Sequence, residues 1–291
     1  MEKIKTYLII APVTIFIIIF FIFGLCSGIC ESLGLISFTG KKGFTFDHYK
    51  QLLTNEVFKD SLLYTAKLAL ISASIALIFS IFILFILYLR KDKKSKVFSR
   101  ILELPILLPY VVASYLILIL FMQSGLLSRL YIYLGIIENF KEFPILTNDE
   151  MGIGIIMTYV WKSSPFIVMM SYPVLLRIEE KFNNLNHILG ISKKMFFVEV
   201  VLPLLGPSLI VSFFIILAFI FTSFETPYLL GVTYPKSLAV LSYEMYSKGN
   251  LSVRPQLMAI NMVISAIAIL AGGIVYWINK NIISKNQRAW K

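Results

Sequence analysis

The chain has 291 residues, of which 58% are hydrophobic and 15% are charged, and its formal net charge is +11. Its mean hydropathy of +0.83 means that it carries more apolar side chain than a water-soluble domain could bury, so lipid must be its solvent. A soluble globular protein is thereby excluded. The positive charge fits membrane topology and anionic lipid, and nucleic-acid binding is not indicated because no basic stretch is interleaved with aromatic residues.

Six apolar segments are long enough to cross a bilayer, since one helical crossing needs about 20 apolar residues. They cover residues 7–29, 62–89, 101–123, 151–176, 208–230 and 257–278. No stretch of similar length is left for a soluble domain. We therefore expect an all-α integral membrane protein with six transmembrane helices, built as a single transmembrane domain over residues 1–291.

The distribution of Lys and Arg among the loops predicts the orientation, because positively charged loops stay in the cytoplasm. These residues are more numerous at the two ends of the chain and in the loops after the second and fourth segments than in the other three loops. Both termini and residues 178–207 are therefore expected to be cytoplasmic. The first apolar run is too long for a typical signal peptide and no clear cleavage site follows it, which predicts a retained first helix.

Residues 178–207 form a polar, helix-forming loop between two apolar segments. Phe182, Leu185 and Leu189 recur at three- and four-residue spacing, which predicts a short helix over residues 181–189 with an apolar stripe that docks on another protein. Gly190 permits a sharp turn after it.

A second short helix is expected after this turn. Ser192 can cap it at its start, and it would extend through Glu199. Pro203 then marks the entrance to the fifth transmembrane helix. Two short helices joined by a turn make a rigid protrusion, which can transmit force where a flexible loop would absorb it.

The spacing within this loop resembles the cytoplasmic loop of permease subunits in binding-protein-dependent ABC importers. The family motif reads Glu-Ala-Ala, three residues, Gly, nine residues, an aliphatic residue, one residue and Leu-Pro. Four positions match it: Gly190, Val200, Leu202 and Pro203. Asn184, Leu185 and Asn186 stand where the motif has Glu-Ala-Ala, so its carboxylate is missing here. ATPase coupling is accordingly assigned to Phe182, Asn184, Leu185, Asn186, Leu189, Gly190, Val200, Leu202 and Pro203.

The resemblance implies the ABC importer permease fold and a subunit that forms half of the translocation pathway for a small solute delivered by an external binding protein. Its implied partners are ATPase subunits, a second permease of different sequence, the binding protein and lipid, in a bacterial cytoplasmic membrane. The chain is expected not to be an enzyme and to bind no cofactor or metal, with ATP and Mg²⁺ held by the ATPase partner. No G-x-x-x-x-G-K-[ST] phosphate-binding loop occurs in it.

A second resemblance bears on the substrate. SFETPYLLG at residues 223–231, followed by YPKSLAVLSYEMY, looks like the polyamine (spermidine/putrescine-type) branch of these permeases. Iron, thiamine and phosphonate importers have similar permeases, so these classes stay open.

Polar residues within the helices are candidates for the translocation path. Lys162 is expected near the middle of the bilayer, where a charge is costly and therefore suggests a functional role. The alternative is that Lys162 pairs with a carboxylate or a carbonyl and only locks the packing. The other candidates are Trp161, Ser163 and Ser164 beside it and Glu225, which could attract a cationic substrate, contact a docked binding protein or simply be solvated. Pro105 and Pro109 should kink the third helix and leave backbone carbonyls for neighbours to satisfy.

The alternative function is an ion-coupled secondary transporter. Such proteins are built from inverted repeats with paired broken helices and carry buried acidic residues. The two halves of this chain show no clear internal similarity, and its helix interiors are poor in Asp and Glu. ATP dependence of uptake at constant ion gradients separates the two functions.

Overall fold

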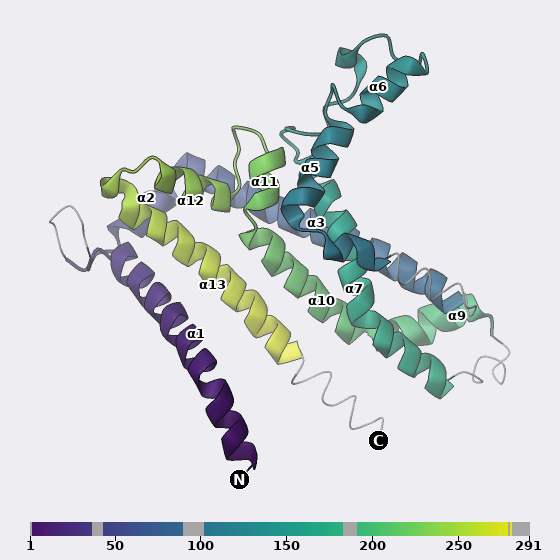
Figure 1. Ribbon diagram of the computed structural model, residues 1–291, viewed down its shortest axis with the longest axis horizontal. Coiled ribbons are helices and arrows are strands. Elements are labelled where there is room, and N and C mark those ends of the chain that lie inside the picture. Colours follow the sequence, from purple (N-terminus) through teal and green to yellow (C-terminus); the bar gives the residue numbers. More distant parts are fainter. Residues whose placement is uncertain (1, 37–42, 90–101, 183–190, 279, 281–291) are drawn as a thin grey trace. The chain divides into compact units, whose positions relative to one another are not determined.

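The computed structural model describes residues 2–36, 43–89, 102–182, 191–278 and 280, and these residues form helices joined by turns and loops. The elements before residue 150 are α1 (Glu2–Ser32), α2 (Asp47–Thr54), α3 (Glu56–Leu89), α5 (Tyr110–Phe121), α6 (Leu126–Tyr133) and η1 (Phe140–Glu142). They are followed by α7 (Ile153–Phe182), α9 (Lys193–Phe196), η2 (Phe197–Val201), α10 (Leu202–Thr222), α11 (Glu225–Leu230), α12 (Leu238–Ser247), η3 (Leu251–Val253) and α13 (Arg254–Ile278) (Figure 1).

Six helical stretches are long and apolar enough to cross a membrane, within the described part of the chain. They are Ile10–Ser32, Glu56–Leu89, Tyr110–Tyr133, Ile153–Phe182, Lys193–Thr222 and Leu251–Ile278. The expected all-helical class and number of spans are therefore confirmed. The cytoplasmic location of the termini stays a prediction.

Residue contacts cluster into two compact units, which are described separately. The first contains residues 1–60 and 238–266, and the second contains residues 61–237 and 267–291. The single transmembrane domain expected from the sequence stays a prediction.

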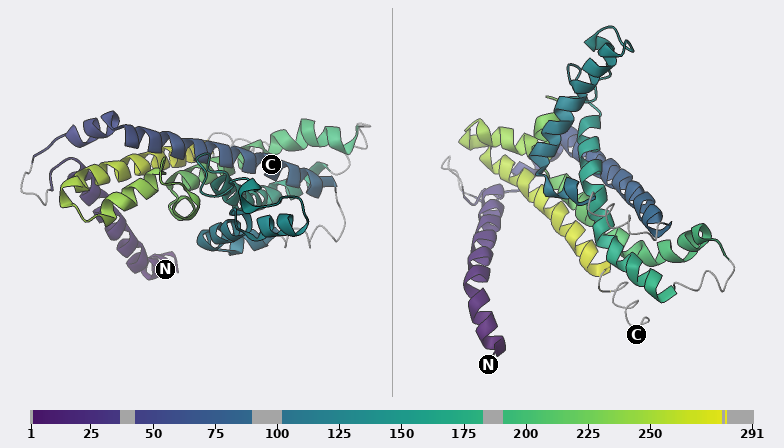
Figure 2. Two further views of the ribbon diagram at one scale, coloured as in Figure 1. Left: turned by 90° about the horizontal axis from the view of Figure 1, so that it is seen from above. Right: turned by 45° about the vertical axis from the view of Figure 1, so that its right-hand side comes forward.

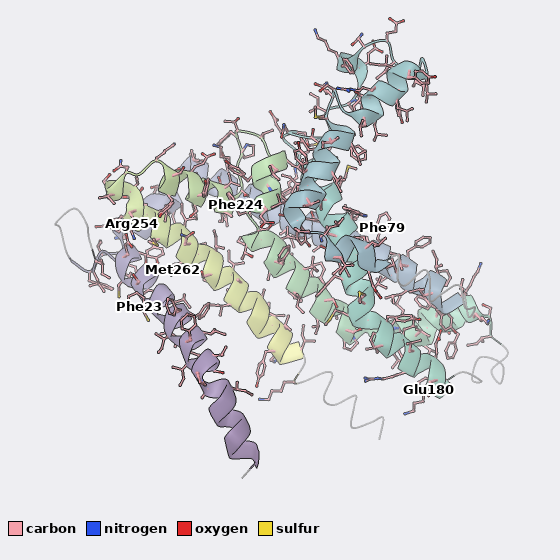
Figure 3. All side chains as sticks on the ribbon, viewed as in Figure 1. Phe23, Phe79, Glu180, Phe224, Arg254 and Met262 are labelled. Carbon is pink, nitrogen blue, oxygen red and sulfur yellow. The ribbon has the colours of Figure 1, made fainter. Side chains whose placement is uncertain are left out.

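Polar pairs join the helices of the first unit. They are Glu31 with Arg254 at 2.6 Å, Ser32 with Tyr49 at 2.8 Å, Gln51 with Gln256 at 2.5 Å and Ser242 with Asn261 at 2.7 Å. Arg254 and Met262 lie along α13 in Figure 3. Met262 also explains Gly28 of α1, because a Cβ at Gly28 would lie 2.8 Å from the Met262 methyl carbon. The glycine thus lets α1 and α13 approach closely.

Helix α7 is the central helix of the second unit and packs against α10, α5 and α11 (Figure 1, Figure 2). Over its most apolar window 56% of the residues are buried, the largest share among the six spans. Small hydroxyl side chains allow close packing and bond across helices: Ser80 Oγ donates to the Ser164 carbonyl at 3.0 Å, and Ser208 Oγ lies 3.2 Å from Ser171 Oγ.

The third spanning segment departs from the continuous helix expected over residues 101–123. Residues 102–107 are helical, the helix is interrupted at Leu108 and Pro109, and α5 starts at Tyr110. Pro109 supplies the N-cap of α5, as its missing N–H allows. The expected kink is confirmed, and the span continues into α6 beyond the expected end.

The fourth helix extends past its expected end at residue 176. Lys181 and Phe182, expected in a separate short helix, form the end of α7 instead. The reason is that residues 177–182 are good helix formers, whereas hydropathy marks only the apolar part of a helix. The rest of the expected short helix, residues 183–190, lies outside the described residues.

The fifth helix begins earlier than expected. Ser192 caps α9 as predicted, its Oγ accepting from the Met195 N–H at 3.3 Å. From Lys193 the helix runs without a break to Thr222, so Pro203 does not open a separate helix. Residues Phe197–Val201 form a π-helical turn directly before Leu202 and Pro203. Such a turn widens the helix where the proline ring would otherwise clash with the carbonyl four residues earlier.

Candidate coupling helix and translocation pocket

The coupling residues predicted from the motif fall partly outside the described residues. Those outside are Asn184, Leu185, Asn186, Leu189 and Gly190. Phe182, Val200 and Leu202 are half-buried, and Pro203 is exposed.

The start of the fifth helix is held in place by side chains that are not part of the motif. Phe196, Phe197 and Val201 are buried. The Phe197 ring packs against α3, with centroid distances of 5.0 Å to Phe85 and 5.4 Å to Tyr88. The start of the fifth helix is therefore anchored on the end of α3. Their apolar character was visible in the sequence, but the π-helical turn shifts the face that they share away from ordinary helical spacing.

Lys162 is the central charged group of the second unit and is only 4% exposed. Its Nζ donates to the carbonyls of Pro105 at 2.5 Å, Ile106 at 3.4 Å and Leu108. These carbonyls belong to the broken third span, where the helix no longer satisfies them. The sequence left a carboxylate or a carbonyl open as the partner of Lys162, and the partners are carbonyls.

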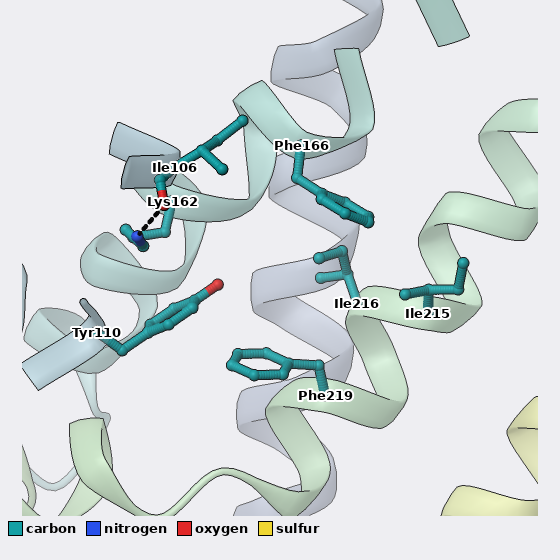
Figure 4. A pocket seen from close by; sticks show the side chains of 7 residues that line it. All are labelled: Ile106, Tyr110, Lys162, Phe166, Ile215, Ile216 and Phe219. Carbon is teal, nitrogen blue, oxygen red and sulfur yellow. Dashed lines mark hydrogen bonds between the residues drawn. The ribbon is translucent and has the colours of Figure 1, made fainter. Parts of the chain in front are cut away.

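A cavity of about 220 Å³ lies beside Lys162 (Figure 4). It is lined by Ile106, Tyr110, Lys162, Phe166, Ile215, Ile216 and Phe219. The Tyr110 ring lies 4.7 Å from Lys162 Nζ, a cation–π distance, and 4.7 Å from the Phe219 ring. We refer to this cavity as the Lys162 pocket. Its walls come from the broken third span, α7 and α10.

The charge of Lys162 has no opposite charge to balance it among the described residues. The described ion pairs, which include Lys59 with Glu56 and Arg254 with Glu31, do not involve Lys162. Carbonyl dipoles solvate the ammonium group but leave a net positive charge inside an apolar environment. The Lys162 pocket is therefore an electropositive site with otherwise mostly apolar walls.

The other predicted path residues lie elsewhere. Trp161 is 38% exposed and, together with Ser164, lines a separate apolar groove of about 860 Å³ between α3, α5 and α7. Ser163 is fully buried. Glu225 is exposed at the first position of α11. None of these four side chains lines the Lys162 pocket.

Sequence reasoning missed most of the Lys162 pocket. Lys162 is the lining residue that the sequence analysis selected, and Ile215, Ile216 and Phe219 lie in a helix that is apolar on all sides. A pattern without polar contrast gives no periodic signal to select one face.

Comparisons with known proteins agree with this architecture. Residues 85–285 match the family model described as binding-protein-dependent transport system inner membrane component. The chain is 29% identical over 226 residues to the molybdate/tungstate transport system permease protein WtpB of Methanocaldococcus jannaschii, which covers 76% of this chain and 82% of that protein.

Two solved structures share the fold. One is a bacterial ABC transporter involved in import of the acidic polysaccharide alginate, with TM-score 0.74 and 18% identity over 94% of this chain and 97% of that one. The other is a bacterial alginate ABC transporter in complex with an alginate pentasaccharide-bound periplasmic protein, with TM-score 0.74 and 19% identity over 96% and 95%.

These relatives are not polyamine permeases, so the comparisons support the importer family without its polyamine branch, and they do not favour an ion-coupled transporter. The matched family model covers well over half of the chain. The chain therefore belongs to the family of binding-protein-dependent ABC importer permeases, as a non-catalytic, multi-pass membrane subunit that works with separate ATPase subunits, a second permease and an extracytoplasmic binding protein.

Proposed function

We propose that the chain forms half of the translocation pathway of an ATP-driven importer for an anionic solute. The observation that carries the choice of an anion is the buried, unbalanced charge of Lys162 beside the pocket. A cationic polyamine would be repelled there, since like charges in a low-dielectric site interact strongly. The named relatives point the same way, because molybdate and tungstate are anions and alginate is described as acidic.

The coupling part of the proposal depends on the continuity of the fifth helix. A stretch that is helical from Lys193 to Thr222 can carry a push along its whole length. Its first turns are anchored on α3 through Phe197, and Ile216 in the same helix lines the Lys162 pocket. At 1.5 Å per residue, Val201 and Ile216 are about 22 Å apart. Movement of the cytoplasmic loop 178–207 by the ATPase would thus reach the pocket wall directly.

Glu225 takes the second of its expected roles in this proposal. A carboxylate on the path of an anion would repel it, whereas a carboxylate at an exposed helix start is electrostatically stable there. We assign Glu225 to contact with a docked binding protein. ATP and Mg²⁺ are assigned to the partner ATPase.

Affinity purification from a mild-detergent membrane extract tests the coupling loop. Gly190→Trp places a bulky side chain at the motif glycine and should remove the ATPase from the purified complex while the second permease remains. Gly43→Trp is the matched control, because a side chain at Gly43 would meet nothing within 4 Å and this residue is expected outside. Mass spectrometry identifies the subunits.

Retention of the ATPase by Gly190→Trp at the level of the control would contradict the role of the loop. If the native chain itself brings down no ATPase, the proposed coupling through this loop is contradicted.

A further inference from the structure

We propose that Lys162 is the anion-binding residue of the translocation pathway, and that its ammonium group exchanges the carbonyls of the broken third span for the oxygens of a small oxyanion in the Lys162 pocket. This inference rests on the proposed function and names the site and the size class of its cargo.

The electrostatics of the Lys162 pocket favour an anion. Lys162 donates to carbonyl dipoles, and no described carboxylate pairs with it. A buried cation without a counter-charge is unfavourable unless it is compensated, so an anion that reaches the pocket gains Coulomb energy that a neutral or cationic solute does not. A lysine suits this task because its ammonium is a compact charge on a flexible stem and can turn between partners.

The position of Lys162 along α7 indicates its depth in the membrane. Lys162 is the tenth residue of α7, which begins at Ile153, and therefore lies roughly 14 Å along the helix. A hydrocarbon core is about 30 Å thick. The apolar segment 151–176 places the start of the hydrocarbon core near the first residue of α7, so the charge is expected near the middle of the membrane, where the barrier to an anion is highest and a positive group lowers it most.

The volume of the cavity indicates the size of the ion that it can hold. The cavity volume is about 220 Å³, and a water molecule occupies roughly 30 Å³ in the liquid. The space accommodates an ion with four oxygens, whereas an oligosaccharide of several sugars is larger than this cavity. Ile106, Phe166 and Ile216 supply apolar walls, which provide few hydrogen bonds to hold the ion, as rapid passage requires.

The contacts around Lys162 connect the site to movement of the third span and the fifth helix. The Lys162 bonds hold the interrupted segment at residues 105–108 against α7. When the ammonium turns to an anion, those carbonyls lose a donor and the segment loses its tie to α7. Ile215 and Phe219 of the fifth helix face the same cavity, so arrival of the ion and motion of the coupling helix act on one set of side chains.

The test uses the complete complex of permeases, ATPase and binding protein, in native form and with Lys162→Arg or Lys162→Gln. Arg keeps the charge, and Gln keeps a hydrogen-bond donor for the carbonyls but loses the charge. Tungstate uptake into proteoliposomes should stay within about threefold of native for Lys162→Arg and fall at least tenfold for Lys162→Gln, with both complexes intact by size-exclusion chromatography. Native uptake rates in Lys162→Gln would overturn the proposal.

A second measurement, the rate of cysteine labelling in the pocket, tests the role of the Lys162 charge even in a complex that has lost uptake for other reasons. Cys26 and Cys30, the two cysteines of the chain, are replaced by Ala, and the half-buried Ile215 by Cys. An anionic methanethiosulfonate should label Cys at this position at least fivefold faster than a cationic one of similar size. Adding Lys162→Gln should abolish or reverse that preference, and an unchanged preference would contradict the proposal.

The outcomes separate the inference from the proposed function. Native uptake that needs ATP but is indifferent to Lys162→Gln refutes the anion site and leaves the importer standing. A charge preference at position 215 that depends on Lys162, in a complex that imports no anion, refutes the proposed cargo and leaves the anion site standing.

Discussion

Two of the helix interruptions in the second unit have different polar groups beside them. At Leu108 and Pro109 the freed carbonyls receive the Lys162 ammonium group. Between α10 and α11 the helix is interrupted at Ser223 and Phe224, and the neighbouring Thr226 hydroxyl accepts from Ser114 Oγ at 2.9 Å. A lysine therefore bonds the carbonyls of one break, and a pair of neutral hydroxyl groups lies beside the other.

The contrast between the two breaks bears on the role of the Lys162 charge. The break between α10 and α11 has a bond between two neutral hydroxyl groups beside it, so an interrupted helix in this unit does not by itself require a lysine. A charge in the middle of a membrane brings a desolvation penalty that function must justify. The charged break also borders the Lys162 pocket, whereas Ser114 and Thr226 do not line it.

The substitution Lys162→Leu removes both the charge and the hydrogen-bond donor at the break in the third span. Each carbonyl left dry and unsatisfied costs about 1–3 kcal/mol, so we expect the largest loss of stability in the molecule here. Thermal unfolding of the detergent-solubilised chain, followed by circular dichroism, measures it. Lys67→Leu is the control, since Lys67 is exposed on α3; equal effects of the two changes would show that the Lys162 bonds contribute nothing.

A smaller effect is expected at a charge placed outside the membrane interior. Both Asp149 carboxylate oxygens lie 2.9 Å from the Ile153 N–H at the start of α7. Asp149→Ala should lower the free energy of unfolding by about 1 kcal/mol, because it removes a helix cap and a favourable charge at a helix start. Asp149→Asn keeps the acceptor and should recover most of the loss in chemical denaturation. No difference between Ala and Asn would contradict the capping role.

The smallest effect is expected beside the break between α10 and α11. Thr226→Val removes the hydroxyl that accepts from Ser114 and should cost about 0.6 kcal/mol, the usual value for a hydrogen bond between membrane helices. Thr222→Val is matched to it, because the exposed Thr222 hydroxyl bonds only within its own helix. A loss at Thr226 as large as that at Lys162 would remove the distinction between the two breaks.

Composition and local chemistry predicted much of this architecture. Lys162 stood out because a charge in an apolar helix is rare, and Pro105 and Pro109 signalled a break because proline lacks a donor. That Lys162 would meet the carbonyls at that break could not be read from the sequence, since 54–57 residues separate the partners and only tertiary packing brings them together.

The limits at the coupling loop have a different cause. Ser192 was identified as a cap from residue type alone, and the structure confirms it. The extension of α7 to Phe182 and the continuity of the fifth helix past Pro203 were missed, because turn-forming residues predict a boundary only where packing does not override it. The pocket residues Ile215 and Ile216 were missed because their helix has no polar face to contrast with.

ATP-driven uptake of tungstate is the decisive measurement for the proposed import of an anion. The reconstituted complex with its binding protein is given tungstate outside, ATP or no ATP on the ATPase side, and ionophores that collapse all ion gradients. We predict uptake that requires ATP and persists without gradients. Uptake that runs on an ion gradient in the absence of ATP, or ATP-driven uptake of a polyamine but no oxyanion, would contradict this account.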